Sequence, residues 1–103
     1  MKVSIMMAAR NAAPYIADAI GSLLRQRDAA ALDIVVVNDG STDGTGDLVR
    51  SLALADVRLI DQPPRGVTPT RNVALSAIAP DADFVTVLDA DDLMPLGRLA
   101  RDL

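Results

Sequence analysis

Residues 33–45 read DIVVVNDGSTDGT, an apolar run that passes directly into a polar turn containing two glycines. The β-branched run Ile34–Val37 predicts a strand, and its unbroken apolar character predicts burial on both faces. The Asn, Asp, Gly and Ser residues that follow predict a turn that leads into a helix. A buried strand followed by a helix is the repeating unit of an α/β fold with a parallel sheet.

The same unit recurs on both sides of this stretch, because strands are also predicted at 3–7, 57–60 and 84–88. Helical spacing follows each strand, beginning at Asn11–Pro14, after Thr45, at Thr68-Pro69 and at Pro95. Thr68 is predicted to be an N-cap with Pro69 as the first helical residue, and Leu96, Leu99, Ala100 and Leu103 to face inward from the last helix. The order βαβαβαβα predicts one domain over residues 1–103, with a parallel four-stranded sheet covered on both faces.

The composition limits the chemistry. The 103 residues include no Cys and no His, so disulfides, thiolate sites, a Cys nucleophile and a His base are excluded. Acid–base work must come from carboxylates, Lys, Tyr or a residue outside this chain. The net charge of −4 argues against a nucleic-acid partner. No apolar run approaches the length of a membrane span and no signal peptide is recognisable, so we expect a cytoplasmic protein, with peripheral membrane contact through parts outside these residues left open.

Polar segments follow three of the predicted strands, at residues 8–11, 38–43 and 89–92. In a parallel sheet the carboxyl ends of the strands meet at one edge, where ligands bind. We therefore expect these three segments to converge on one site, although they are far apart in the sequence.

The third segment places Asp89, Asp91 and Asp92 within four positions. Carboxylates crowded at a strand end favour a hard divalent cation such as Mg²⁺ or Mn²⁺. The alternative is an acidic turn that caps the next helix. If the chain stays extended, Asp89 and Asp91 face one side and Asp92 the other.

In the second segment, Asp39 can accept a hydrogen bond from a ring N–H such as that of uracil, and Gly40 permits the sharp turn. Ser41 or Thr42 is expected to cap the next helix, and a helix cap with an Asx-turn is the alternative interpretation of the whole segment. No P-loop or G-x-G-x-x-G is present, so a bound diphosphate would rely on a metal and a cation such as Arg71. A solvated helix residue is the alternative interpretation of Arg71, and Arg10 is a loop cation without an assigned role.

Four segments of the chain resemble the N-terminal half of family 2 glycosyltransferases, which have the GT-A fold. Residues 3–11 resemble the opening strand and its P-x-Y-N turn, and residues 33–45 resemble the family's EIIVVDDGSTDGT. Residues 70–72 resemble its A-R-N, and residues 84–92 resemble the strand that ends in D-A-D-D. The resemblance implies an α/β, Rossmann-like fold with a mostly parallel sheet, truncated relative to the parent enzymes.

The resemblance also implies site residues: Ala8, Ala9, Asn11, Asp39, Arg71 and Asp89 for the nucleotide, and Asp91 with Asp89 for Mg²⁺ or Mn²⁺. Asp39 would contact the base, with the Ala8–Ala9 backbone beside it, and Asp91 would be the main metal ligand. The donor would be a nucleotide-diphospho-sugar, often UDP-linked. Its sugar would pass with inversion to a hydroxyl of an acceptor saccharide or lipid-linked saccharide, in bacterial exopolysaccharide or surface polysaccharide synthesis.

The chain departs from the family pattern in three ways. Ala8 and Arg10 replace the Pro and Tyr of the first turn, and Asn38 replaces the first Asp of the D-D-G-S pair. The enzymes also run well past the acidic segment, so the general base is expected beyond Leu103. We expect these 103 residues alone to bind nucleotide weakly and to transfer no sugar.

Two other functions are compatible with the sequence. The chain could be a non-catalytic fragment that acts only as a nucleotide-binding or interaction module. A phosphate-transfer receiver or a phosphatase is less favoured, because those proteins carry the key Asp after the first or third strand. Finally, the fourth strand is expected to have a bare edge, which predicts self-association through that edge or by exchange of the terminal helix.

Overall fold

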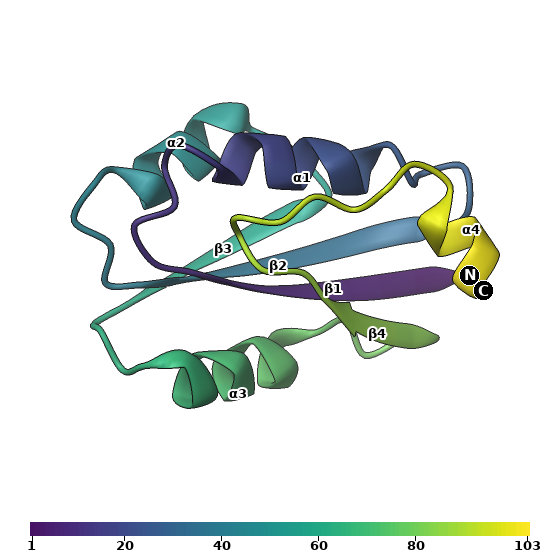
Figure 1. Cartoon of the computed structure of the whole chain (residues 1–103). Coiled ribbons are helices and arrows are strands. Elements are labelled where there is room, and N and C mark those ends of the chain that lie inside the picture. The colour runs from purple at the N-terminus through teal and green to yellow at the C-terminus, as the bar shows by residue number, and fades with distance from the viewer.

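The computed structural model describes all of residues 1–103 and confirms the α/β, Rossmann-like fold. Its elements are β1 (Lys2–Ala9), α1 (Ile16–Leu24), β2 (Ala31–Asp39), α2 (Thr45–Leu52), β3 (Val57–Gln62), α3 (Val67–Ala77), β4 (Phe84–Val87) and α4 (Arg98–Asp102). The four strands are parallel and lie in the order β3-β2-β1-β4. Figure 1 shows α1 and α2 on one face of the sheet and α3 on the other.

The two faces of the sheet carry cores of different size. The larger core, of 18 buried residues, fills the space between the sheet, α1 and α2, and it includes Met94 and Leu99 from the C-terminal segment. The smaller core joins β2 to α3 through Val35, Val37 and Ala74. All five residues of β2 from Leu32 to Val36 are buried, as expected for a central strand.

The fourth strand is an edge strand rather than a strand buried on both faces. It pairs only with β1, and Phe84, Val85 and Val87 are 49%, 41% and 44% exposed. The expectation of coverage on both faces is therefore wrong for β4, because Phe84 and Val85, which point to opposite faces of the sheet, are both exposed.

The last helix also differs from the prediction. It begins at Arg98 instead of Pro95, and Leu99 is its only buried residue, whereas Leu96 is 79% exposed. Ala100 and Leu103 are exposed as well. The cause lies in α1 and the turn after it, where the side chains of Ser22 and Gln26 accept hydrogen bonds from the amides of Met94 and Leu99. These bonds hold the segment before α4 in an irregular path.

Helix α3 begins one residue before the predicted N-cap. Gly66 is the N-cap, with φ of 98°, and Thr68 and Pro69 are the second and third helical residues. Pro69 fits there because the first-turn amides of a helix have no intrahelical partner. The Gly66 carbonyl accepts bonds from the amide and hydroxyl of Thr70, which fixes the start of the helix. Ile78 follows the helix with an extended backbone.

The strands and α1 lie close to their predicted positions, although α1 begins at Ile16, two residues after Pro14. None of the helices combines the length and the apolar character that a membrane span requires.

Candidate functional site

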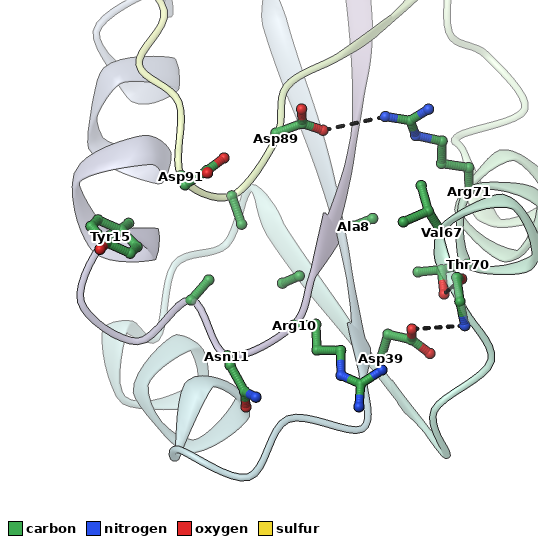
Figure 2. Close-up of a pocket in the computed structure, with 14 residues that line it drawn as sticks. Ala8, Arg10, Asn11, Tyr15, Asp39, Val67, Thr70, Arg71, Asp89 and Asp91 are labelled. Carbon is green, nitrogen blue, oxygen red and sulfur yellow. Dashed lines mark hydrogen bonds and ion pairs between the residues drawn. The ribbon is translucent and has the colours of Figure 1, made fainter.

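The carboxyl ends of the strands border a pocket of about 370 Å³ (Figure 2). Its lining residues are Ala8, Ala9, Arg10, Asn11, Ala12, Tyr15, Asp39, Gly66, Val67, Thr70, Arg71, Asp89, Ala90 and Asp91. All seven residues predicted for the nucleotide or the metal are among them. The three polar segments thus converge as the parallel topology requires, and the volume is sufficient for a small ligand.

At one end of the pocket, Asp39 is held by donors from the protein. Its Oδ1 accepts bonds from Gln62 Nε2 at 3.1 Å and the Arg65 amide at 2.7 Å, and its Oδ2 accepts one from the Gly66 amide at 3.0 Å. Burial raises the pKa of the Asp39 carboxyl, but the bonds from Gln62 and the two amides lower this pKa by more. Asp39 is therefore a fixed, ionised acceptor.

The turn after Asp39 depends on Gly40, which has a φ of +67°. A Cβ at this position would overlap the ring of Pro64. The absence of a side chain at Gly40 lets the loop from β3 to α3 approach β2. This approach brings the amides of Arg65 and Gly66 within reach of Asp39.

The acidic segment forms a tight turn at the other end of the pocket. The amide of Asp92 donates to the carbonyl of Asp89 at 3.0 Å. One carboxylate oxygen from each of Asp89, Asp91 and Asp92 lies within 4.8 Å of the others, and all three residues are exposed. The expectation that Asp92 faces away is wrong, because the backbone turns instead of staying extended. Three carboxylates with no nitrogen or sulfur ligand suit Mg²⁺ or Mn²⁺.

Arg71 connects the helix side of the pocket to the acidic turn. Its Nη2 lies 3.4 Å from Oδ1 of Asp89, and both side chains are about half exposed (Figure 2). Arg71 therefore lines the pocket while it stays half exposed, so its guanidinium can reach an anion bound there.

Asn11 lines the pocket, but its side chain is engaged in joining two loops. Its Oδ1 accepts bonds from the amide and hydroxyl of Thr42, and its amide donates to Ser41 Oγ at 3.0 Å. The backbone of Asn11 has a φ of 50°, in the region that asparagine tolerates better than most residues. Asn11 thus fixes the turn after β1 against the turn after β2.

The same junction explains why Ser41 and Thr42 do not cap α2. The N-cap of α2 is Gly44, with a left-handed φ of 84°, and no side chain caps the helix. Asp43 accepts bonds from Thr45 and from the Ala13 amide instead. The predicted capping role of Ser41 and Thr42 is therefore wrong, since they bond to Asn11.

The substitution at Asn38 has a local explanation. Its Nδ2 donates to Oδ1 of Asp61 at 3.0 Å, and Asp61 is also paired with Arg50. Hydrogen bonds from Asn38 and Arg50 hold the pKa of Asp61 below its ordinary value. An aspartate at position 38 would bring a second carboxylate against Asp61, whereas the amide of Asn38 supplies a donor.

Sequence reasoning missed the contribution of Gln62, Gly66 and Thr70. Gln62 Nε2 donates to Asp39 and also to Thr70 Oγ1 at 3.0 Å, so it joins the end of β3 to α3 behind the pocket. The available signal was its position, because Gln62 ends the third strand at the same edge as Asp39.

A sequence model of the family described as glycosyl transferase family 2 matches residues 4–101. The succinoglycan biosynthesis protein ExoU of Rhizobium meliloti (strain 1021) is 38% identical in an alignment 104 residues long. The alignment covers 96% of this chain and 29% of ExoU. The uncharacterized glycosyltransferase EpsJ of Bacillus subtilis (strain 168) is 34% identical over 101 residues. This alignment covers 96% of this chain and 28% of EpsJ. The chain thus spans less than a third of the length of these relatives.

Two solved structures share the architecture and the GT-A fold. Residues 1–349 of S. aureus TarS in complex with UDP-GlcNAc match with a TM-score of 0.85 and 28% identity, covering 99% of this chain and 30% of that one. The mannosyltransferase PcManGT from Pyrobaculum calidifontis, in complex with GDP-Man and Mn²⁺, matches with a TM-score of 0.83 and 32% identity. The match covers 95% of this chain and 30% of PcManGT.

Proposed function

This chain belongs to glycosyl transferase family 2, and from that premise we propose that it is the donor-binding region of an enzyme that transfers a sugar from a nucleotide-diphosphate donor to an acceptor hydroxyl. One observation carries the proposal. The carboxylate suited to a base N–H and the carboxylates suited to a divalent metal line the same pocket, and Arg71 lies beside Asp89 in it (Figure 2).

The base is assigned to the end of the pocket that contains Asp39. The Asp39 carboxylate accepts a ring N–H, and the Ala8–Ala9 backbone forms the wall beside the base. Asn11 supports this wall through its bonds to Ser41 and Thr42. UDP is the first candidate donor nucleotide, because uracil offers the required N–H; TarS and PcManGT were solved with UDP-GlcNAc and GDP-Man.

The diphosphate is assigned to the end formed by Arg71 and the acidic turn. Asp91 and Asp89 hold Mg²⁺ or Mn²⁺, and Asp92 is close enough to add a third oxygen. When bound, the metal neutralises negative charge on the departing nucleoside diphosphate. Arg71 donates to the phosphate oxygens, and its charge favours the same developing negative charge.

The remaining steps require groups that the pocket does not offer. Asp39 is already saturated at one oxygen, and Asp89 and Asp91 are committed to the metal, so we assign the general base to the enzyme beyond Leu103. The acceptor hydroxyl then attacks the anomeric carbon with inversion as the nucleoside diphosphate leaves. The succinoglycan biosynthesis role in the name of ExoU supports an acceptor saccharide or lipid-linked saccharide of a bacterial polysaccharide.

The proposal is tested by titrating UDP and GDP into the 103-residue chain with and without Mn²⁺, using calorimetry. Nucleotide binding that strengthens with Mn²⁺ supports a donor site. Complete absence of binding under both conditions would instead favour the non-catalytic interaction module.

For the 103-residue chain on its own, we also propose that β4 pairs with β4 of a second copy. The outer edge of β4 leaves backbone donors and acceptors unpaired, and its exposed residues are apolar. A two-fold contact of this kind is closed and self-complementary, so it predicts a dimer.

A further inference from the structure

The pocket contains a cation that has no partner within the protein. Arg10 lines the pocket and is exposed, and neither an ion pair nor a side-chain hydrogen bond holds its guanidinium. The other cation of the pocket, Arg71, is paired with Asp89. An Arg that enters a ligand pocket without a partner has all its N–H donors available for a ligand.

The sheet register places Arg10 beside Asp39. In the parallel pair of β1 and β2, Ala9 lies opposite Asn38, so Arg10 and Asp39 are the next residues of two adjacent strand ends. Figure 2 shows the guanidinium of Arg10 extending toward the side of the pocket where Asp39 lies. The turn that carries Arg10 is fixed by Asn11 through its bonds to Ser41 and Thr42.

The Asp39 carboxylate has unused acceptor capacity. A carboxylate offers about four acceptor positions, two on each oxygen. Gln62 and the Arg65 amide use both positions on Oδ1, and the Gly66 amide uses one on Oδ2. One acceptor position on Oδ2 is thus left for a ligand in the pocket.

Taking the donor-binding function proposed above as its basis, we propose that Arg10 and Asp39 together select nucleobases that present a ring N–H next to a carbonyl. Asp39 Oδ2 accepts the ring N–H, and Arg10 donates to the adjacent carbonyl oxygen. Uracil offers this pair at N3–H and O4, and guanine offers it at N1–H and O6. Arg10 is thereby a specificity-determining residue at the position where the family pattern has a tyrosine.

Cytosine and adenine present the opposite arrangement. Each has an unprotonated ring nitrogen, which would place a lone pair against the Asp39 carboxylate, next to an exocyclic amine directed at the donors of Arg10. An acceptor of the base would then face the acceptor Asp39, and a donor of the base would face the donors of Arg10, so neither contact would form a hydrogen bond. Such mismatches reject a ligand more strongly than the loss of an apolar contact does.

The test compares UDP, GDP, CDP and ADP by calorimetry on the 103-residue chain with Mn²⁺ present, using Arg10→Met as the variant. Arg25→Met is the matched control, because Arg25 is also an exposed Arg without an ion pair but lies outside the pocket. We expect UDP and GDP to bind at least about tenfold more tightly than CDP and ADP. We expect Arg10→Met to weaken UDP about tenfold, which corresponds to one charge-assisted hydrogen bond. CDP binding should not weaken in this variant, because the substitution also removes the mismatch between the donors of Arg10 and the cytosine amine.

The outcomes separate this inference from the proposed function. An equal loss for all four nucleotides in Arg10→Met would mean that Arg10 contacts the phosphates, and it would overturn base selection by Arg10. Unchanged discrimination in the variant would overturn it as well. Failure of the unaltered chain to bind any nucleotide would overturn the donor-binding function itself, and this inference with it.

Discussion

Arg71 Nη2 lies 3.4 Å from Asp89 Oδ1, so the cation assigned to the diphosphate is paired with a carboxylate assigned to the metal. Both side chains are about half exposed, and such a pair contributes about 0.2–1 kcal/mol. The pair is therefore weak enough for a ligand to separate, but it still competes with a metal for Asp89.

The first prediction concerns this competition. Arg71→Met should raise the affinity for Mn²⁺ about two- to fivefold in the absence of nucleotide, because Asp89 loses its internal partner. Binding of Mn²⁺ is measured by electron paramagnetic resonance, without any enzyme assay. The control is Arg98→Met, which removes a similarly exposed pair with Asp102 outside the pocket. Lower Mn²⁺ affinity in Arg71→Met would contradict the competition.

The second prediction concerns the metal ligands. Asp91→Asn should weaken Mn²⁺ binding about 10- to 100-fold and remove the Mn²⁺ dependence of UDP binding, because one charged oxygen ligand is lost. Asp28→Asn serves as the control, since Asp28 is an exposed aspartate remote from the turn. If both variants bound Mn²⁺ like the unaltered chain, Asp91 would not be a metal ligand.

The third prediction concerns Asp33, at the opposite end of the sheet from the pocket. This buried carboxylate accepts bonds from Ser4, from Arg58 and from the Ala79 amide, and so ties three strands to the segment that follows α3. Burial raises the pKa of Asp33, but the bonds from Arg58, Ser4 and Ala79 lower it by more, to below its ordinary value of 3.8.

Because its pKa is depressed in the folded chain, Asp33 stabilises the fold fully when the pH is above its pKa in the unfolded chain. This contribution is lost as the pH falls through the pKa of Asp33 in the folded chain. The free energy of unfolding should therefore fall as the pH drops below about 3.8. Asp33→Asn should reduce it by about 1–3 kcal/mol at pH 7 and flatten the acid dependence. Urea unfolding at several pH values measures both effects. Asp81→Asn, which removes only an exposed pair with Lys2, should change stability by less than about 0.5 kcal/mol.

Much of the fold could be predicted from the sequence because its strands are continuous apolar runs. Ile34–Val37 lies within β2, and the positions of the other strands follow from the same pattern. The exposed path before α4 could not be predicted, because it depends on bonds to Ser22 and Gln26, which lie about 70 residues earlier. Local spacing predicted that Leu96 faces inward. The bonds to these distant partners set the path of the segment instead, and Leu96 is exposed.

The candidate site shows the same division. Its position followed from topology, since segments after β1, β2 and β4 had to meet at one edge. The support of Asp39 did not follow, because it comes from backbone amides of Arg65 and Gly66, and amides carry no sequence signal. The place of Asp92 was likewise decided by a backbone turn that residue types alone do not specify.

The fourth prediction separates two causes of strain at glycines. Gly40→Ala should lower the free energy of unfolding by about 2–5 kcal/mol, because it adds a clash with Pro64 to a left-handed backbone. Gly44→Ala is the matched control, since Gly44 is also left-handed but an added Cβ there would have no neighbouring atom within 4 Å. It should cost only about 1–2 kcal/mol. Thermal unfolding compares the two, and equal losses would show that the approach of Pro64 does not constrain the turn.

The fifth prediction concerns the bare edge of β4. The 103-residue chain should dimerise as its concentration rises, and Val85→Lys should return it to a monomer, because a charge on an edge strand opposes pairing with another edge. Light scattering after size-exclusion chromatography measures the mass. Leu75→Lys on α3 is the control, since Leu75 is 52% exposed and belongs to a helix instead of the edge strand. A monomer at every concentration would contradict pairing through β4, and a dimer lost equally in both variants would place the contact on another surface.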